Sequence, residues 1–181
     1  MKWSNPGNEF NEVSDKLIDK YNKKKIYIYG AGLRGKRISR VFNKITDYKI
    51  HAFIDRDEEK QHHLYCGKQV VPVEQVMNLS QQELEDSVVI IALEEDTAKK
   101  VKLQLTNERK ELHCFTYNEF MVLDFPIIAM YKYNKCYLNT ASILVTERCT
   151  LKCEKCAIML PYYKDIKKFA FKYFTHQLPK E

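Results

Sequence analysis

The chain has 181 residues, a formal net charge of +6, 45% hydrophobic residues and 30% charged residues. This composition is that of a globular protein, with room for one domain and part of a second. The basic residues are spread along the chain, which does not favour a nucleic-acid partner. The polar N-terminus has no signal-peptide core and no apolar run is long enough to cross a bilayer. We therefore expect a cytoplasmic protein, with no membrane partner and mostly reduced cysteines.

Strand and helix patterns alternate along the first two thirds of the chain. An amphipathic helix is predicted at residues 9–22, where Phe10, Val13, Leu17 and Tyr21 share one face. The stretch "DRDEEKQHHLYCGKQ" (55–69) is expected to form a polar loop. Strands are predicted in "IYIY" (26–29), "YKIHAFID" (48–55), "QVVPVEQV" (69–76, turning into a helix), "SVVIIAL" (87–93) and "ELHCFTY" (111–117).

Helical patterns follow the first of these strands, through Ile38, Val41 and Phe42, and the fourth, over residues 96–110. This alternation predicts an α/β fold, a doubly wound parallel sheet of about four or five strands. We expect the chain to be divided into an N-terminal helix at 1–23, a Rossmann-like domain at 24–118, a connecting helix and linker at 119–137, and a separate segment at 138–181.

A glycine-rich loop, "GAGLRG", lies between the first predicted strand and the following helix. Gly30 would permit a tight turn, Gly32 would leave room for a phosphate, and Gly35 would let the helix pack closely on the strand. Arg34 is a candidate phosphate contact, and Asp55 at the end of the second strand is a candidate acceptor for ribose hydroxyls. The alternative is that the loop is only the turn that such a fold requires.

Residues 25–118 resemble the small Rossmann-like domains at the N-termini of sugar O-acyltransferases and nucleotide-sugar dehydratases. The resemblance rests on GAG-x-x-GK, on a strand ending in F-I-D, and on a later G-x-x-V. It implies a nucleotide or nucleotide-sugar ligand, or a purely structural module; NAD is a further candidate for the glycine loop. Hydride transfer is not expected, because nothing later in the chain resembles a catalytic Tyr-x-x-x-Lys pair or a substrate domain.

Three cysteines, Cys149, Cys153 and Cys156, have the spacing C-x3-C-x2-C in "TERCTLKCEKC". Three thiolates on one loop can hold three irons of a 4Fe-4S cluster and leave the fourth iron open. The stretch resembles the radical S-adenosylmethionine superfamily, which implies a 4Fe-4S cluster and S-adenosylmethionine as cofactors. Lys155 departs from the family, which often has an aromatic residue before the third cysteine.

Only 25 residues follow Cys156, so we expect residues 138–181 to be the first strand and cluster loop of a truncated radical SAM barrel, inactive as this chain alone. The alternative is a stand-alone, non-catalytic nucleotide-binding module. Its cysteine tail would then be vestigial, or would bind zinc together with Cys136. Residues 161–174 predict an amphipathic helix whose unpaired face is a candidate surface for homodimerisation.

Overall fold

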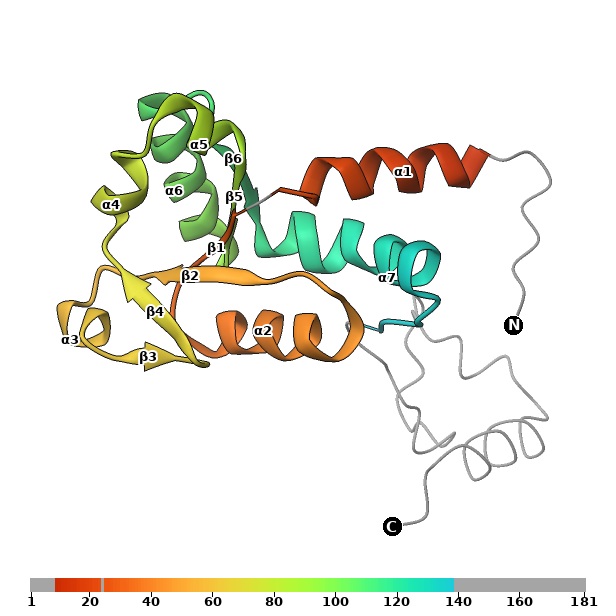
Figure 1. Cartoon of the computed structure of the whole chain (residues 1–181), viewed down its shortest axis with the longest axis horizontal. Coiled ribbons are helices and arrows are strands. Elements are labelled where there is room, and N and C mark those ends of the chain that lie inside the picture. The colour runs from red at the N-terminus through yellow and green to blue at the C-terminus, as the bar shows by residue number, and fades with distance from the viewer. Residues whose placement is uncertain (1–8, 24, 139–181) are drawn as a thin grey trace, which may run out of the picture. The chain divides into compact units, whose positions relative to one another are not determined.

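The computed structural model describes residues 9–23 and 25–138 (Figure 1). The chain forms two compact units, Met1–Asn139 and Thr140–Glu181, and all described residues belong to the first. The three cysteines of the predicted cluster loop and the predicted helix at 161–174 lie outside the described residues.

The described part of the chain contains one six-stranded sheet in the order β3-β4-β2-β1-β5-β6. Four of its five strand pairs are parallel, and only β3 runs antiparallel to its neighbour. The strand order reverses direction beside β1, as in a doubly wound Rossmann-like fold, which confirms the predicted parallel sheet. The strands are β1 Lys25–Tyr29, β2 Ile50–Ile54, β3 Leu64–Tyr65, β4 Lys68–Val71, β5 Ser87–Ile91 and β6 His113–Thr116.

Helices cover both faces of this sheet (Figure 1). One face packs against α1 Glu9–Tyr21, α2 Leu33–Ile45, η1 Asn118–Asp124 and α7 Phe125–Tyr133, and the other against α4 Val73–Met77, α5 Gln81–Glu85 and α6 Glu95–Glu108. The helix α2 buries Ile38, Val41 and Phe42, the residues that recur at helical spacing in the sequence. Alternate residues of β1 and β5 enter the two cores, so both strands are buried on both faces.

Residues 56–68 form more structure than the expected polar loop. They contain the short helix α3 Glu58–Gln61 and the strand β3, which turns into β4 through Cys66 and Gly67. Both turn residues have positive φ, 51° and 74°, as a two-residue type I′ hairpin requires. A strand of two residues carries no alternating pattern, so periodicity could not reveal it.

The segment 119–137 is part of the same core and not only a connection. Phe120, Met121, Phe125 and Ile128 are fully buried against α2 and the sheet. η1 is a π-helix, with hydrogen bonds from residue i to i+5. This geometry changes the usual 3.6-residue spacing of apolar positions, which explains why the sequence did not indicate a core helix here.

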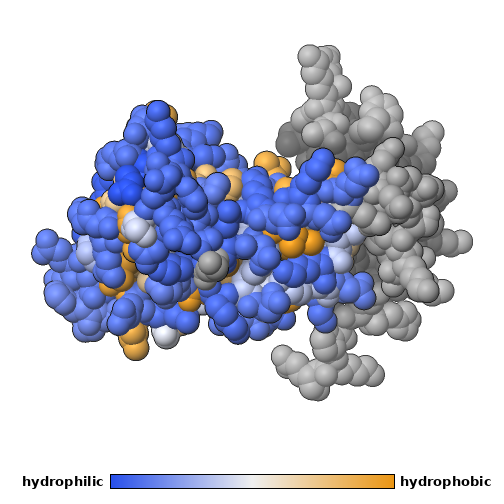
Figure 2. Space-filling view, turned by 45° about the horizontal axis from the view of Figure 1, so that its top comes forward, coloured by the Kyte–Doolittle hydropathy of each residue, from blue (hydrophilic) through white to orange (hydrophobic). Residues whose placement is uncertain are grey.

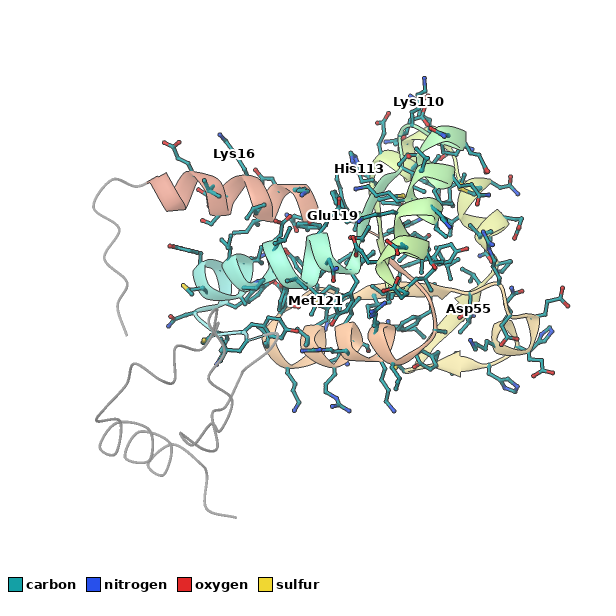
Figure 3. All side chains as sticks on the ribbon, turned by 180° about the vertical axis from the view of Figure 1, so that it is seen from behind. Lys16, Asp55, Lys110, His113, Glu119 and Met121 are labelled. Carbon is teal, nitrogen blue, oxygen red and sulfur yellow. The ribbon has the colours of Figure 1, made fainter. Side chains whose placement is uncertain are left out.

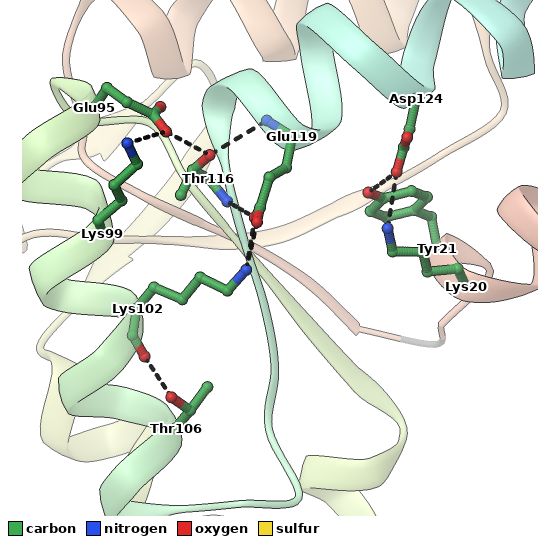
Figure 4. A network of polar contacts seen from close by, with 9 residues as sticks. All are labelled: Lys20, Tyr21, Glu95, Lys99, Lys102, Thr106, Thr116, Glu119 and Asp124. Carbon is green, nitrogen blue, oxygen red and sulfur yellow. Dashed lines mark hydrogen bonds and ion pairs between the residues drawn. The ribbon is translucent and has the colours of Figure 1, made fainter.

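Polar contacts hold η1 to its neighbours (Figure 4). Lys102 of α6 places its Nζ 2.6 Å from a carboxylate oxygen of Glu119, and Glu119 also accepts the backbone N–H of Thr116. Asp124 accepts the Tyr21 hydroxyl at 2.6 Å. These contacts join α1 and α6 to the segment that follows the sheet.

On the face seen in Figure 2, the surface of the described residues is mainly hydrophilic, with small separate hydrophobic patches. No helix of the described part is long and apolar enough to cross a membrane.

Candidate functional site

The glycine loop joins the end of β1 to the start of α2, beside the strand β5. Gly30 has a φ of +110°, a conformation that favours glycine, and a Cβ there would lie 3.0 Å from the Leu93 side chain. A Cβ on Gly35 would lie 2.3 Å from the Gly30 carbonyl oxygen. Gly35 therefore allows the first turn of α2 to approach the strand, which agrees with the packing role that its spacing predicted.

Gly32 differs from these two glycines because its conformation needs no glycine. Its φ of −137° is ordinary extended backbone, and a Cβ there would meet no protein atom within 4 Å. Gly32 is the N-cap of α2, where neither a side-chain cap nor an acidic residue in the first turn is present among the described residues. This helix end therefore presents a partial positive charge and backbone N–H groups beside an open space.

Asp55 lies directly after β2, at the hairpin side of the sheet (Figure 3). Its carboxylate accepts the N–H of Ala31 at 2.9 Å and the N–H of Asp57 at 3.1 Å, and Lys60 Nζ lies 3.2 Å from it. Burial by itself raises the pKa of Asp55, but these hydrogen bonds and the Lys60 charge together hold that pKa below its usual value.

Asp55 is therefore a brace for the glycine loop, since it holds the residue between the first two glycines. The contact of Asp55 with ribose hydroxyls stays a prediction. Oδ1 accepts only one of these three contacts, so it can accept a further hydrogen bond from a ligand.

Arg34 and Tyr65 connect the glycine loop to its surroundings. The Arg34 guanidinium donates to the carbonyl of Leu93, after β5, and lies 5.8 Å from the centre of the Tyr117 ring. The Tyr65 hydroxyl donates to the Gly32 carbonyl at 3.0 Å. The phosphate contact of Arg34 stays a prediction. The guanidinium has five N–H donors, so it can bind a phosphate as well as the Leu93 carbonyl. Tyr65 gave no signal in the sequence, because it lies in the stretch that was expected to be a polar loop.

A cavity of about 200 Å³ opens next to Gly30 on the α6 side. It is smaller than the pockets of about 300 Å³ or more that hold whole ligands, so it has room for one part of a ligand. Arg56 lines it and donates from Nε to the Tyr29 hydroxyl at 2.9 Å. Its lining consists of Tyr29, Gly30, Asp55, Arg56, Leu93, Thr97 and Val101. Sequence reasoning named only Gly30 and Asp55 of this set, because the others meet only when β5 and α6 fold beside β1.

The metal site predicted at Cys149, Cys153 and Cys156 lies outside the described residues. Within the part of the chain that the structure describes, no group of three or more His, Cys, Asp or Glu residues could hold a metal ion. Cys136 and Cys66 are exposed there, and Cys114 is buried, which raises its pKa to about 12.

Comparison with known proteins gives one family match. The model for the PglD N-terminal domain matches residues 25–103, which is less than half of the chain. The match begins at β1, covers the glycine loop and Asp55, and ends within α6. It supports the Rossmann-like part of the resemblance, and it does not extend to Cys149, Cys153 and Cys156. No curated protein matches the chain.

Two solved structures are similar at low identity. The chain is 15% identical to a protein described as RSP in complex with beta-NADH, over 59% of this chain and 58% of the other, with a TM-score of 0.42. It is 17% identical to the methyltransferase FkbM from Methylobacillus flagellatus KT, over 67% of this chain and 32% of the other, with a TM-score of 0.44. The chain thus spans about half of the first protein and a third of the second.

Proposed function

We propose that the Rossmann-like domain binds a nucleotide or nucleotide-sugar, with the phosphates at the N-terminus of α2. The observation that carries this proposal is the open space at Gly32. Gly30 and Gly35 are explained by backbone conformation and packing, whereas neither backbone strain nor packing within the described residues requires a glycine at Gly32. A glycine at that position is explained if a phosphate approaches the backbone closely.

The surroundings of Gly32 suit such a ligand. The first turn of α2 contributes a helix dipole and the Arg34 side chain, both of which favour an anion. The neighbouring cavity, which is lined by Leu93, Val101 and Thr97 on one side, would take the base or the sugar. The PglD N-terminal domain model covers this same segment, in agreement with the resemblance to N-terminal domains of sugar-modifying enzymes. The pyrophosphate of NAD would fit the same loop and is the competing ligand.

Isothermal titration calorimetry of the full chain with UDP, UDP-N-acetylglucosamine and NADH tests the proposal. We expect at least one of them to bind, and Gly32→Ala to weaken that binding by about tenfold, or 1.4 kcal/mol. Because Gly32 has ordinary backbone angles and free space, Gly32→Ala should fold normally, with a melting temperature lowered by only a few degrees because alanine is a poorer N-cap than glycine. Asn43→Ala, on the exposed side of α2, is the matched control and should bind normally. Equal affinity of Gly32→Ala and wild type, or no binding at all, would contradict the proposal.

We also propose that the cysteine loop belongs to a radical SAM core, supported by the spacing of Cys149, Cys153 and Cys156. The three thiolates would hold a 4Fe-4S cluster. When bound, the cluster and S-adenosylmethionine supply the radical chemistry of that superfamily. The Rossmann-like domain would then tether a nucleotide-linked substrate or sense a nucleotide metabolite.

Anaerobic reconstitution with iron and sulfide tests the second proposal. We expect the wild type to take up about four irons per chain and to absorb in the visible region. The triple variant Cys149→Ala, Cys153→Ala, Cys156→Ala should take up none. If the wild type takes up no iron, or tightly holds zinc, the radical SAM proposal fails. The alternative of a non-catalytic nucleotide-binding module with a vestigial or zinc-binding tail would then stand.

A further inference from the structure

A second cavity lies at the opposite end of the strands from the glycine loop. Its volume is about 390 Å³, larger than that of the cavity beside Gly30. It is lined by residues at or near the amino ends of three parallel strands, among them Lys25 of β1, His51 of β2 and Lys68 of β4. Residues of the helix α4 and of the β3–β4 hairpin also line it. Its volume falls in the range of pockets that hold small ligands.

An irregularity in β2 places His51 at this cavity. The pairing of β1 with β2 steps from Ile26–Ile50 to Tyr27–Ala52, so His51 is an extra residue in the ladder. Such bulges are rare between parallel strands and re-aim side chains. The pairing of β2 with β4 begins only at Phe53, which leaves His51 beside an unpaired stretch of strand. The imidazole ring lies edge-on to the Tyr27 ring, with 5.2 Å between the centroids.

The polar lining of the cavity is positively charged. None of its lining residues, all within the described part of the chain, is acidic. Lys25 is paired with Glu83, whose carboxylate lies 2.9 Å from the ammonium, whereas Lys68 forms no ion pair among the described residues. Burial, and then the charges of Lys25 and Lys68, lower the pKa of His51. A bound anion would oppose this shift and favour protonation of the imidazole.

We propose that this cavity is a second ligand site, which binds a small molecule with an anionic group and an apolar body. The anionic group would contact Lys68 and His51. The apolar body would lie against Val71, Val76 and Leu79, which line the cavity on the β4 and α4 side. This site shares no lining residue with the cavity beside Gly30, and the proposal does not rest on nucleotide binding. Both carboxylates and phosphate monoesters offer this chemistry.

The experiment is an NMR titration of the full chain that follows the Cε1–H signal of His51. The His51→Gln variant identifies this signal among those of the five histidines of the chain, because it lacks only that signal. The probes are hexanoate, hexyl phosphate and uncharged hexanol at millimolar concentration. We expect hexanoate, hexyl phosphate or both to bind saturably and to raise the pKa of His51. Hexanoate binding should be stronger at about pH 6 than at about pH 8, because protonated His51 then adds a second cation.

The variant Lys68→Gln should weaken this binding by about tenfold, the effect of losing one charge-assisted hydrogen bond. Lys44→Gln, in the last turn of α2 on the other face of the sheet, is the matched control and should bind as the wild type does. Binding of only one anionic probe supports the site and identifies its headgroup. The proposal is overturned if neither anion moves the His51 signal, if hexanol binds equally well, or if Lys68→Gln binds like Lys44→Gln.

Discussion

At the scale of single residues, each of the three glycines in the loop has a different physical role. Gly30 supplies a backbone conformation and Gly35 supplies a close approach of helix to strand. Gly32 leaves free space outside the protein surface, at the start of α2. Asp55 then fixes this loop from the next strand through the N–H of Ala31. The loop is thus held in place before any ligand arrives, which lowers the entropy cost of binding.

The brace made by Asp55 predicts a pH-dependent stability. Since the pKa of Asp55 is lowered in the folded state, its contribution is fully present at pH 7 and is lost as pH falls below about 4, the ordinary carboxyl pKa. Asp55→Asn should lower the free energy of unfolding by about 1–2 kcal/mol at pH 7, because it removes charge-assisted hydrogen bonds. Urea denaturation of both proteins at a series of pH values measures this difference. A difference that stays constant down to about pH 3 would argue against the brace.

At the scale of secondary-structure elements, the β3–β4 hairpin has two functions. It extends the sheet beyond β4 and forms part of the cavity that contains His51. It also reaches the glycine loop, where the Tyr65 hydroxyl binds the Gly32 carbonyl. The hairpin depends on a turn of two residues with positive φ, and one of them, Cys66, is not a glycine.

The turn therefore predicts opposite effects for two substitutions. Cys66→Asn should stabilise the protein by about 0.5 kcal/mol, because asparagine tolerates positive φ better and Asn-Gly is the preferred type I′ pair. Gly67→Ala should destabilise it by about 1 kcal/mol, because φ is +74° at a position with no compensating contact. Thermal unfolding of both variants checks the prediction. A rise in melting temperature for Gly67→Ala would show that the turn has another conformation.

At the scale of the whole molecule, the compact unit extends well beyond the alternating strand and helix patterns. The sheet core includes Tyr21 from α1 and the buried aromatic residues of η1 and α7. The open glycine loop and the cavity at His51 lie at opposite ends of the same parallel strands. The two cavities share no lining residue, so single substitutions can address each of them separately.

This extent predicts the outcome of shortening the chain. A fragment of residues 1–138 should unfold cooperatively with the secondary structure described above, because it keeps the complete core. A fragment of residues 1–117 should not fold, because it loses the fully buried Phe120, Met121, Phe125 and Ile128. Burial of each of these side chains stabilises the fold by about 2 kcal/mol or more. Their sum exceeds about 5 kcal/mol, the free energy of unfolding of a marginally stable domain. Circular dichroism during heating distinguishes the two fragments, and a cooperative transition in the shorter one would contradict the prediction.

The sequence by itself determined the parallel α/β fold, the position of the glycine loop and the reasons for Gly30 and Gly35. These features depend on patterns within a few consecutive residues, which local periodicity and backbone sterics control.

Only the tertiary structure decided that Asp55 holds Ala31, that Asp124 holds Tyr21, and that a bulge directs His51 to a cavity. These contacts join residues up to about 100 positions apart, and they exist only after the sheet has brought the segments together. No local pattern encodes such pairs, because their free energy depends on the packing of the whole domain.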